Sequence, residues 1–470
     1  MQRRTMLGAS ASAVVGGTVL SSGLGPGAGV SPAYAEPGND HDRIKANVIA
    51  QFAGTPATNA DPATAGKRDK IIATARTRIK ELDASGTDEV FAGVPLGSSD
   101  KNLTTTFTGL TEIALATRMP GAPADLLDNA DVQLRVLDAF ALVHQKYYGD
   151  QGAGYFGNWF NWEIGQPTQI TRAFVLLEDP LNQYRPGLLA TFVATMDAYL
   201  RAGKDGDVDL ESRFHTGANL ADITTNRIIQ GALLGDDQRV AKAVSDQLTV
   251  YATVDPDNLV NDVSDGYYAD GSFIQHDSVA YTGSYGKILL QRSLQTIKIL
   301  DQTGWSQADK LVPVVHGWVA RGFAPVIFEG WMMEIVKGRG VSRTTTGYVD
   351  ALAVVEAAVD LASYESGDQA GAMGGYAKYL TEISRAKVDP GAFVSPGSIV
   401  AYAALLADDS VSAANLTPAV STYAYNAMAR NVHHRPGWTF ALARSSSRIS
   451  KYEYMGGENL RPWFSGDGAH

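Results

Sequence analysis

The chain has 470 residues, enough for two or more domains, and its 45% hydrophobic and 19% charged content excludes a disordered protein. It contains no cysteine, which excludes disulfides, thiolate nucleophiles and cysteine-based metal sites. A net charge of −11 argues against a general polyanion-binding surface, so an anionic ligand would need a local cluster of Arg and Lys.

Residues 1–35 have the pattern of an export signal. Arg3 and Arg4 precede a weakly apolar, glycine-rich stretch that ends in AYA, a small-x-small cleavage site. The paired arginines indicate the twin-arginine route, and the apolar run is too short to span a membrane. We therefore expect a secreted, extracellular monomer that is free of the membrane and whose net charge falls to −13 when the two arginines are removed.

From Asp40 to about Asp408 the chain carries apolar residues at helical spacing. Gly-, Asp- and Asn-rich loops separate these segments. Because paired helices recur without a fixed sequence repeat, we expect helical hairpins wound into a bundle or toroid. The predicted helical segments are 131–148, 171–177, 187–200, 287–300, 349–363 and 397–407.

The pattern changes near residue 430. The stretch WTFALARSSSRISKYEYM (438–455) is largely alternating and β-prone, which predicts strands. A single hairpin cannot hold itself together. Either these strands dock on the helical body, or the sequence is a piece of a longer protein.

The first motif with chemical potential is NWFNWEIGQP (158–167), which mixes asparagines with Trp159, Phe160 and Trp162. Exposed aromatic faces stack on sugar rings, and amides hydrogen-bond to sugar hydroxyls. A buried aromatic hinge between helices explains the same composition equally well.

The second motif is HTGANLADITTNR (215–227), in which Asn219 lies where a helix could begin. A side-chain amide at such a position often caps the helix. It could instead point into a cleft and hydrogen-bond to a carboxylate.

The third motif is DGSFIQHDSVAYTGSYG (270–286), which places His276 nine residues before Tyr285. On a continuous helix or strand, nine residues put the two side chains on opposite faces. They can act together only if the backbone bends, and Gly283 and Gly286 would permit a bend. A loop histidine and a packed tyrosine are the alternative.

The fourth motif is VKGRGVSRT (336–344), where Lys337, Arg339 and Arg343 form the densest basic patch of the chain. Guanidinium groups bind carboxylates in a bidentate manner, so this patch could hold an anionic substrate. A solvated surface loop would have the same composition.

Five stretches in this order, NWFNWEIGQP, TGAN, DGSFIQHDSVAYTGSYG, GRGVSR and YEYMGGENLRPWFSGDG, resemble polysaccharide lyase family 8, which contains hyaluronate, chondroitin AC and xanthan lyases. The resemblance runs from about residue 45 to the end of the sequence. It implies a mainly α fold, with an incomplete (α/α) toroid over 36–425 and the first strands of a β-sandwich domain over 426–470. Family members continue beyond the SGDG motif, so we expect this second domain to be truncated.

The resemblance also implies roles for residues at matching positions. Asn219 matches an asparagine that binds the uronate carboxylate of the substrate, and His276 and Tyr285 match the histidine and tyrosine of the acid–base machinery. The family often has a second tryptophan where this chain has Phe160. The other matches are arginines beside that tyrosine (Arg339 and Arg343), an aromatic patch that guides the polymer (Trp159 and Phe160, with Asn158 and Trp162 in the same motif), and an asparagine offered across the cleft with its supporting carboxylates (Asn459, with Glu458 or Glu453).

The implied reaction is β-elimination at a uronic acid, in which a base removes the C5 proton and an acid protonates the oxygen leaving C4. Asn219, helped by His276, would stabilise the developing enolate charge. Tyr285 would act as base, acid or both, and Arg339 and Arg343 would favour its phenolate. Which of His276 and Tyr285 is the general base stays open. No metal or other cofactor is expected.

Other classes and substrates also remain open. A glycoside hydrolase on an (α/α) toroid could use Glu163 with Asp222 or Asp270, and a non-catalytic carbohydrate-binding fragment is a third reading. Among the lyases, hyaluronate is the preferred substrate because NWFNWEIGQP and AYTGSYG look most like hyaluronate lyases. Xanthan and chondroitin are alternatives. We expect an anionic polysaccharide as partner and no nucleic acid.

Overall fold

The computed structural model describes residues 38–97, 99–149, 155–460 and 468–469, so the predicted export segment at 1–35 lies outside the described residues. No helix among the described residues is both long and apolar enough to cross a bilayer. The α-helices are α1 (Asp40–Phe52), α2 (Pro56–Ala60), α3 (Ala65–Asp83), α4 (Asp100–Arg118), α5 (Ala130–Val143), α6 (Gln166–Leu176), α7 (Glu178–Tyr184), α8 (Leu188–Tyr199), α9 (Gly217–Leu234), α10 (Asp237–Leu248), α11 (Lys287–Ile299), α12 (Ala308–Gly317), α13 (Gly347–Tyr364), α14 (Gly367–Ile383) and α15 (Pro396–Ala407).

The segments predicted to be helical from apolar spacing are confirmed by α5, α6, α8, α11, α13 and α15. Local polar residues fix where several helices begin. The side-chain oxygens of Asn39, Ser99 and Asn129 accept a backbone N–H in the first turn of α1, α4 and α5. At the other end of a helix, Gly235 follows α9 with a φ of 67°, a backbone conformation that glycine adopts without strain.

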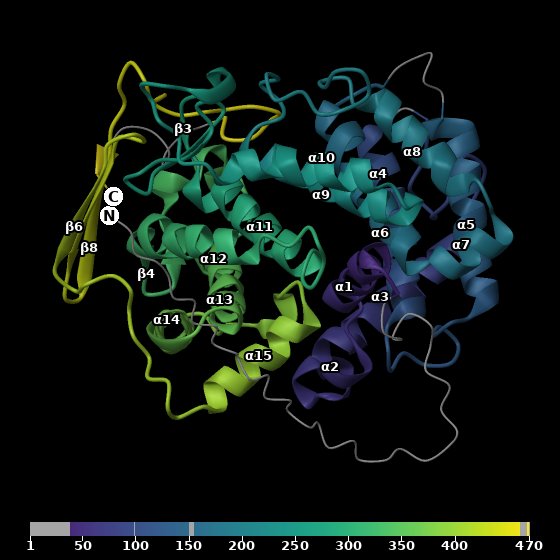
Figure 1. Ribbon diagram of the computed structural model, residues 1–470, viewed down its shortest axis with the longest axis horizontal. Coiled ribbons are helices and arrows are strands. Elements are labelled where there is room, and N and C mark those ends of the chain that lie inside the picture. Colours follow the sequence, from purple (N-terminus) through teal and green to yellow (C-terminus); the bar gives the residue numbers. More distant parts are fainter. Residues whose placement is uncertain (1–37, 98, 150–154, 461–467, 470) are drawn as a thin grey trace, which may run out of the picture. The chain divides into compact units, whose positions relative to one another are not determined.

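The helices pair into hairpins, as the recurring pattern predicted. Only two residues separate α9 from α10 and α13 from α14, and each pair packs together, so the partners run antiparallel. Such pairs lie side by side as an incomplete (α/α) toroid (Figure 1). α9 is central to it, because it packs against α1, α6, α10 and α11 and is buried from Gly217 to Ala232.

Two small sheets interrupt the helices where the sequence predicted only loops. β1 (Gly266–Tyr267), β2 (Phe273–Gln275) and β3 (Val279–Ala280) form an antiparallel sheet, with Ile274 opposite Gly266 on one side and Ala280 on the other. β4 (Ile327–Phe328) and β5 (Trp331–Met332) form a hairpin. The strands are so short that no alternating pattern could develop in the sequence.

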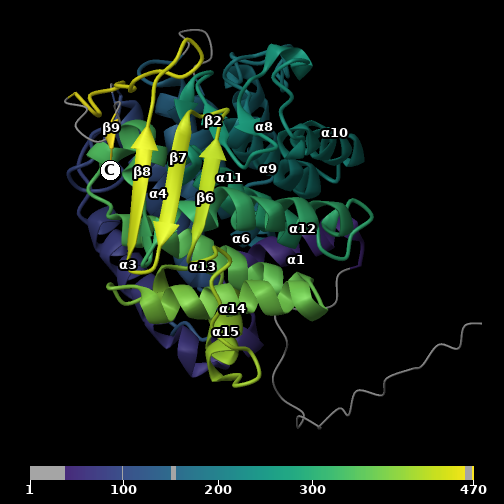
Figure 2. The same ribbon diagram turned by 90° about the vertical axis from the view of Figure 1, so that its left-hand side faces the viewer.

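A four-stranded antiparallel sheet follows the helices. Its strands are β6 (Ser421–Tyr425), β7 (Arg430–Arg435), β8 (Trp438–Ala443) and β9 (Gly468–Ala469), in that order. Figure 2 shows β6, β7 and β8 side by side in front of the helices. One face docks on the helical body, where the Tyr425 hydroxyl donates to the Arg321 carbonyl at 2.8 Å and Arg430 Nε donates to the Ile335 carbonyl at 2.8 Å.

This sheet differs from the prediction in two respects. It begins at Ser421, so the predicted boundary after residue 425 cuts between two paired strands. Of the β-prone stretch 438–455, only Trp438–Ala443 forms a strand. The rest is irregular because its polar groups bind to other parts of the chain, as described below.

Candidate active site

A tight turn brings His276 and Tyr285 together. β2 ends at Gln275, and the next two residues, His276 and Asp277, have φ values of 56° and 63°. The chain then reverses through β3 and enters a π-helical turn, Thr282–Gly286, that carries Tyr285. The imidazole and phenol rings meet with centroids 4.8 Å apart. The bend that the nine-residue spacing required is therefore present.

The bend does not lie at the predicted glycines. Gly286 has a φ of −60°, an ordinary helical value, and the left-handed residues are His276 and Asp277 instead. Gly283 and Gly286 serve close packing: an added Cβ would lie 3.0 Å from Met332 Cγ and 3.1 Å from the Phe273 ring, respectively. An Asp at left-handed φ is tolerated because its short polar side chain can hydrogen-bond locally.

Glu453 connects the charged groups of the site. Its carboxylate accepts hydrogen bonds from His276 Nδ1 at 2.6 Å, from Arg339 Nη1 at 2.7 Å and from the Tyr281 hydroxyl. Burial by itself would raise the pKa of Glu453, but the hydrogen bonds from His276 and Tyr281, together with the nearby positive charge, lower it to about 2. Glu453 is therefore an anion that ties three side chains together.

The contact with Glu453 fixes the state of the His276 ring. Because Nδ1 faces a carboxylate at 2.6 Å, it must carry the proton, and the neutral ring then has its lone pair on Nε2. The side chain of His276 is 26% exposed. The imidazole therefore has a free nitrogen that can accept a proton.

Tyr281, the other tyrosine of the 270–286 motif, looks from the sequence like a packing residue, but it does more than pack. Its ring is fully buried and lies edge-on to Tyr285 at 4.8 Å, so it does pack. Its hydroxyl, however, donates to Glu453 and accepts from Arg339 Nη1 at 3.0 Å. The four-residue spacing of Tyr281 and Tyr285, which puts both rings on one side of a helical turn, was the available signal.

The arginine motif lies against both tyrosines. Arg339 belongs to a 3-10 turn, Gly338–Ser342, and its Nη2 donates to the Tyr285 hydroxyl at 2.9 Å. Gly338 permits this approach: its φ is 53°, and an added Cβ would lie 2.2 Å from the Tyr281 ring. Arg339 and Arg343 both bind Glu458, through Nε contacts of 2.9 and 2.8 Å. The carboxylates therefore neutralise much of the predicted basic patch.

Tyr285 is not shifted toward its phenolate, contrary to the prediction. Burial raises the pKa of Tyr285, and the lowering by Arg339 and Arg343 does not offset it. The negative charge of Glu453 raises the pKa further. In this state of the protein Tyr285 therefore keeps its proton and can act as a donor.

Asn219 is not the cap of its helix. Thr216 holds the N-cap position of α9, and Asn219 is the third helical residue, with only 5% of its surface exposed. Within the described part of the chain, no hydrogen-bond partner is found for the Asn219 amide. The start of α9 is joined to the histidine turn through Gln275, whose Oε1 accepts from the Ala218 N–H at 3.4 Å. The amide is thus available next to that turn.

The aromatic motif divides into an outer and an inner part. Phe160 is 37% exposed, Trp159 contacts it at a centroid distance of 6.3 Å, and the backbone N–H of Phe160 donates to the Asn158 side chain. Phe214, which the sequence interpretation missed, lies 4.9 Å from the Trp159 ring. Its position five residues before Asn219 was the only available signal.

Trp162 was predicted to bind substrate, and the structure contradicts this. Only 1% of its surface is exposed, its ring stacks on Tyr148 at 5.8 Å, and its Nε1 donates to the Phe156 carbonyl at 2.7 Å. Both faces of the ring and its polar atom are thus committed to the protein interior, so Trp162 has no surface to offer a sugar.

Asn459 also differs from the prediction. It is 3% exposed, and its Nδ2 donates to the Glu453 carbonyl at 2.7 Å, while its backbone N–H binds Ser342 Oγ at 2.9 Å. The amide therefore shapes the turn between Glu453 and Glu458 and fastens it to the arginine motif, instead of being offered across a cleft. Glu458 pairs with Arg339 and Arg343.

The carboxylates proposed for a hydrolase are all bound within the fold. Glu163 accepts from the Tyr155 hydroxyl at 2.9 Å and is 3% exposed, and Asp222 pairs with Arg292. Asp270 accepts from backbone N–H groups at 2.9 and 3.0 Å. The described residues also contain no cluster of three acidic or histidine side chains that could hold a metal ion.

Two models of known protein families match this chain. The model of the N-terminal alpha-helical domain of polysaccharide lyase family 8 matches residues 49–373, and that of the family's super-sandwich domain matches residues 420–470. A xanthan lyase from Bacillus sp. (strain GL1) is 29% identical over 449 residues, covering 94% of this chain and 45% of that protein. A hyaluronate lyase from Staphylococcus aureus (strain NCTC 8325 / PS 47) is 26% identical over 432 residues, covering 86% and 51%. The chain thus spans about half the length of these relatives.

Solved structures share the fold. Paenibacillus xanthan lyase has a TM-score of 0.77 at 26% identity, over 92% of this chain and 39% of that one. Streptomyces coelicolor A3 chondroitin AC lyase has a TM-score of 0.78 at 24% identity, over 91% and 56%. Since the match to the N-terminal family model alone covers more than half of the sequence, this chain belongs to polysaccharide lyase family 8.

Proposed function

We propose that this chain is a polysaccharide lyase that cleaves a uronate-containing polymer by β-elimination. The observation that carries the proposal is the contact between His276 and Tyr285, whose rings lie 4.8 Å apart, each with a fixed polar partner. One group has a free nitrogen that can take a proton, and the other has a hydroxyl that can give one. β-Elimination needs this pair, because a proton leaves C5 and another reaches the oxygen departing from C4.

The hydrogen-bond partners of the two side chains support a division of roles. His276 Nε2, held in place by Glu453 at Nδ1, removes the C5 proton. The Tyr285 hydroxyl, which keeps its proton in the unliganded protein, delivers it to the glycosidic oxygen. The C4–O bond breaks, a C4–C5 double bond forms, and no water is consumed. Proton exchange with solvent restores both groups for the next cycle.

The amide of Asn219 would bind the carboxylate of the substrate. It has no hydrogen-bond partner among the described residues and lies in the first turn of α9, whose N-terminal dipole favours negative charge. Hydrogen bonding to the uronate carboxylate would stabilise the charge that develops when the C5 proton leaves.

The aromatic patch, defined as Trp159, Phe160 and Phe214, would hold the polymer. The guanidinium of the exposed Arg213 lies 4.8 Å from the Phe214 ring. An arginine beside apolar ring faces suits a polymer that alternates sugar faces with carboxylates. An acidic protein needs a local cation to attract an anionic polymer. Arg213 suits this role better than Arg339 and Arg343, which are paired with carboxylates.

Within this activity we propose hyaluronate as the substrate, with xanthan and chondroitin as alternatives from the same family. The proposal rests on the aromatic motif and the tyrosine motif, and the relatives include proteins named hyaluronate lyase and xanthan lyase. We further propose that the protein acts outside the cell, on the basis of the sequence pattern of residues 1–35.

The test is to incubate the full chain with each of the three polymers and follow ultraviolet absorbance and reducing ends together. A lyase releases products whose new double bond absorbs in the ultraviolet. Reducing ends without that absorbance would instead show a hydrolase, and polymer binding without any product would leave a carbohydrate-binding protein. The polymer with the highest kcat/KM identifies the substrate.

A further inference from the structure

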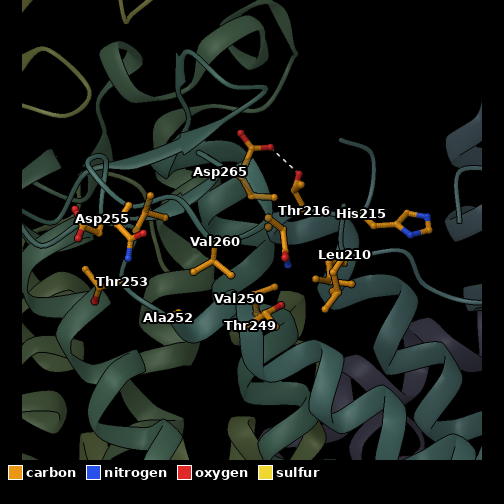
Figure 3. Close-up of a pocket in the computed structure, with 16 residues that line it drawn as sticks. Leu210, His215, Thr216, Thr249, Val250, Ala252, Thr253, Asp255, Val260 and Asp265 are labelled. Carbon is orange, nitrogen blue, oxygen red and sulfur yellow. Dashed lines mark hydrogen bonds between the residues drawn. The ribbon is translucent and has the colours of Figure 1, made fainter. Parts of the chain in front are cut away.

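Asp265 lies beside the histidine turn and binds three groups from two separate segments of the chain. It immediately precedes β1 and is 7% exposed. Its Oδ1 accepts the backbone N–H of Asp277 at 2.8 Å, and its Oδ2 accepts from Thr216 Oγ1 at 2.6 Å and from Gln275 Nε2 at 2.9 Å. Figure 3 shows Thr216 and Asp265 pointing toward each other across this contact.

The groups that Asp265 binds flank two residues of the proposed site. His276 lies between Gln275 and Asp277 in the chain, and Asn219 follows Thr216 by one helical turn. Gln275 strengthens the connection, because its Nε2 also donates to Thr216 Oγ1 at 3.1 Å. The start of α9 and the histidine turn are therefore joined by the buried Asp265 carboxylate together with the Gln275 side chain.

Hydrogen bonds, and not packing, hold the histidine turn and the start of α9 in place on the side of Asp265. Thr216 and Asp265 line a cavity of about 280 Å³, whose walls also include Leu210, Val250 and Val260 (Figure 3). A cavity provides no opposing atoms to resist movement, so packing is weak on this side. The turn above has His276 and Asp277 at positive φ, which is unfavourable unless neighbouring contacts hold it.

We propose that Asp265 is a positioning residue of the lyase site, which holds His276 and Asn219 in register without touching the substrate. This inference rests on the proposed β-elimination. Because Thr216, Gln275 and the Asp277 N–H all donate, Asp265 serves as an ionised acceptor, and an amide in its place would have to turn its N–H₂ group toward at least one of these donors. Loss of the carboxylate should therefore separate the two halves of the site.

The experiment compares Asp265→Asn with the wild type, using the polymer that the wild type cleaves. We expect kcat to fall by on the order of 100-fold, because small displacements of catalytic groups have effects of this size. KM should change little, since the aromatic patch that binds the polymer is untouched. The matched control is Asp262→Asn, the same substitution at an exposed position of the same loop, which should keep both constants.

The folded fraction of each variant is measured from its thermal unfolding at the assay temperature, so that a loss of folded protein is not counted as a loss of kcat. If Asp265→Asn fails to fold, Thr216→Val provides the second test, because it removes one donor to the same carboxylate. Thr216 makes no side-chain cap for α9, so the only other contact that its hydroxyl loses is the one with Gln275 Nε2 in the same network. We expect a fall in kcat of about tenfold for this variant.

The outcomes separate the two proposals. Wild-type kcat in a folded Asp265→Asn or Thr216→Val variant would overturn the positioning role while leaving the lyase activity intact. A loss of kcat/KM that comes entirely from a higher KM, with kcat unchanged, would overturn it as well, because Asp265 would then act on polymer binding. Absence of an absorbing product from the wild type on all three polymers would overturn the lyase proposal and this inference together.

Discussion

The candidate active site combines two regions that are held in place by different forces. His276, Tyr281 and Tyr285 belong to the helical body, where Phe273 and Thr282 beside them are fully buried. The C-terminal arm, defined as residues 450–459, has no strand or helix, and most of it is exposed. It is held by the Glu453 and Glu458 contacts and by Ser450, whose N–H donates to the Ser278 carbonyl at 2.9 Å.

The difference indicates how each region should respond to perturbation. Apolar packing is insensitive to salt and pH, so the positions of the two tyrosine rings should persist under most conditions. Ion pairs weaken with salt and with protonation of the carboxylate. The arm should therefore be the first part of the site to detach, and its loss would free the arginines and remove the partner of His276.

The largest effect is expected from a substitution at Tyr285, in the part of the site that belongs to the helical body. Tyr285→Phe removes the proton donor while keeping the ring and its packing, so kcat should fall by about 1,000-fold with polymer binding retained. Turnover is measured by ultraviolet absorbance and binding by polymer titration. Tyr184→Phe, an exposed tyrosine on α7, is the control and should be silent. Wild-type turnover in the Tyr285 variant would contradict the proposed mechanism.

The next largest effect is expected from a substitution at Glu453, in the C-terminal arm. Glu453→Gln removes the anion that binds His276, Tyr281 and Arg339, so we expect kcat to fall by about 100-fold. The arm should also become more accessible, which faster tryptic cleavage after the exposed Lys451 would reveal. Glu211→Gln, at an exposed loop position, controls for the lost charge. An arm that stays protected from trypsin would show that packing, not charge, holds it.

A smaller effect concerns the polymer-binding surface and does not involve the arm. Trp159→Ala should weaken polymer binding by about tenfold, or about 1.4 kcal/mol, while kcat and tryptic cleavage of the arm stay unchanged. Trp162→Ala is the informative comparison. Because that ring is buried, it should lower the free energy of unfolding by about 3–5 kcal/mol, as measured by urea denaturation. Equal effects of the two substitutions on binding would contradict the division of the motif.

The smallest effect is a pH dependence of the arm. The folded-state pKa of Glu453 is lowered to about 2 from a usual 4.5, so its contribution to stability is present above pH 4.5. That contribution is lost as pH falls from 4.5 toward 2. The difference in unfolding free energy between the wild type and Glu453→Gln should be constant above about pH 5 and shrink below it. A difference that stays constant down to pH 2 would contradict the lowered pKa.

Much of this arrangement could be predicted from the sequence. The residues whose roles were not predicted have one feature in common. Asn219, His276, Tyr285 and Arg339 lie in motifs specific enough to identify a site. The second role of Tyr281 was missed because its partner, Glu453, is 172 residues away in the chain. Asp265 was missed for the same reason, since Thr216 lies 49 residues before it. A motif indicates which residues take part, but long-range contacts decide what they bind.

By itself, the sequence determined the helices, through apolar spacing within single segments, and the family, through five motifs in a fixed order. Both are local properties that a linear pattern can carry. Only the tertiary structure decided that Tyr285 keeps its proton, that Phe160 is exposed while Trp162 is buried, and that the bend falls at His276 and Asp277. Desolvation and charge pairing depend on which distant segments come together, so these properties exist only in the folded chain.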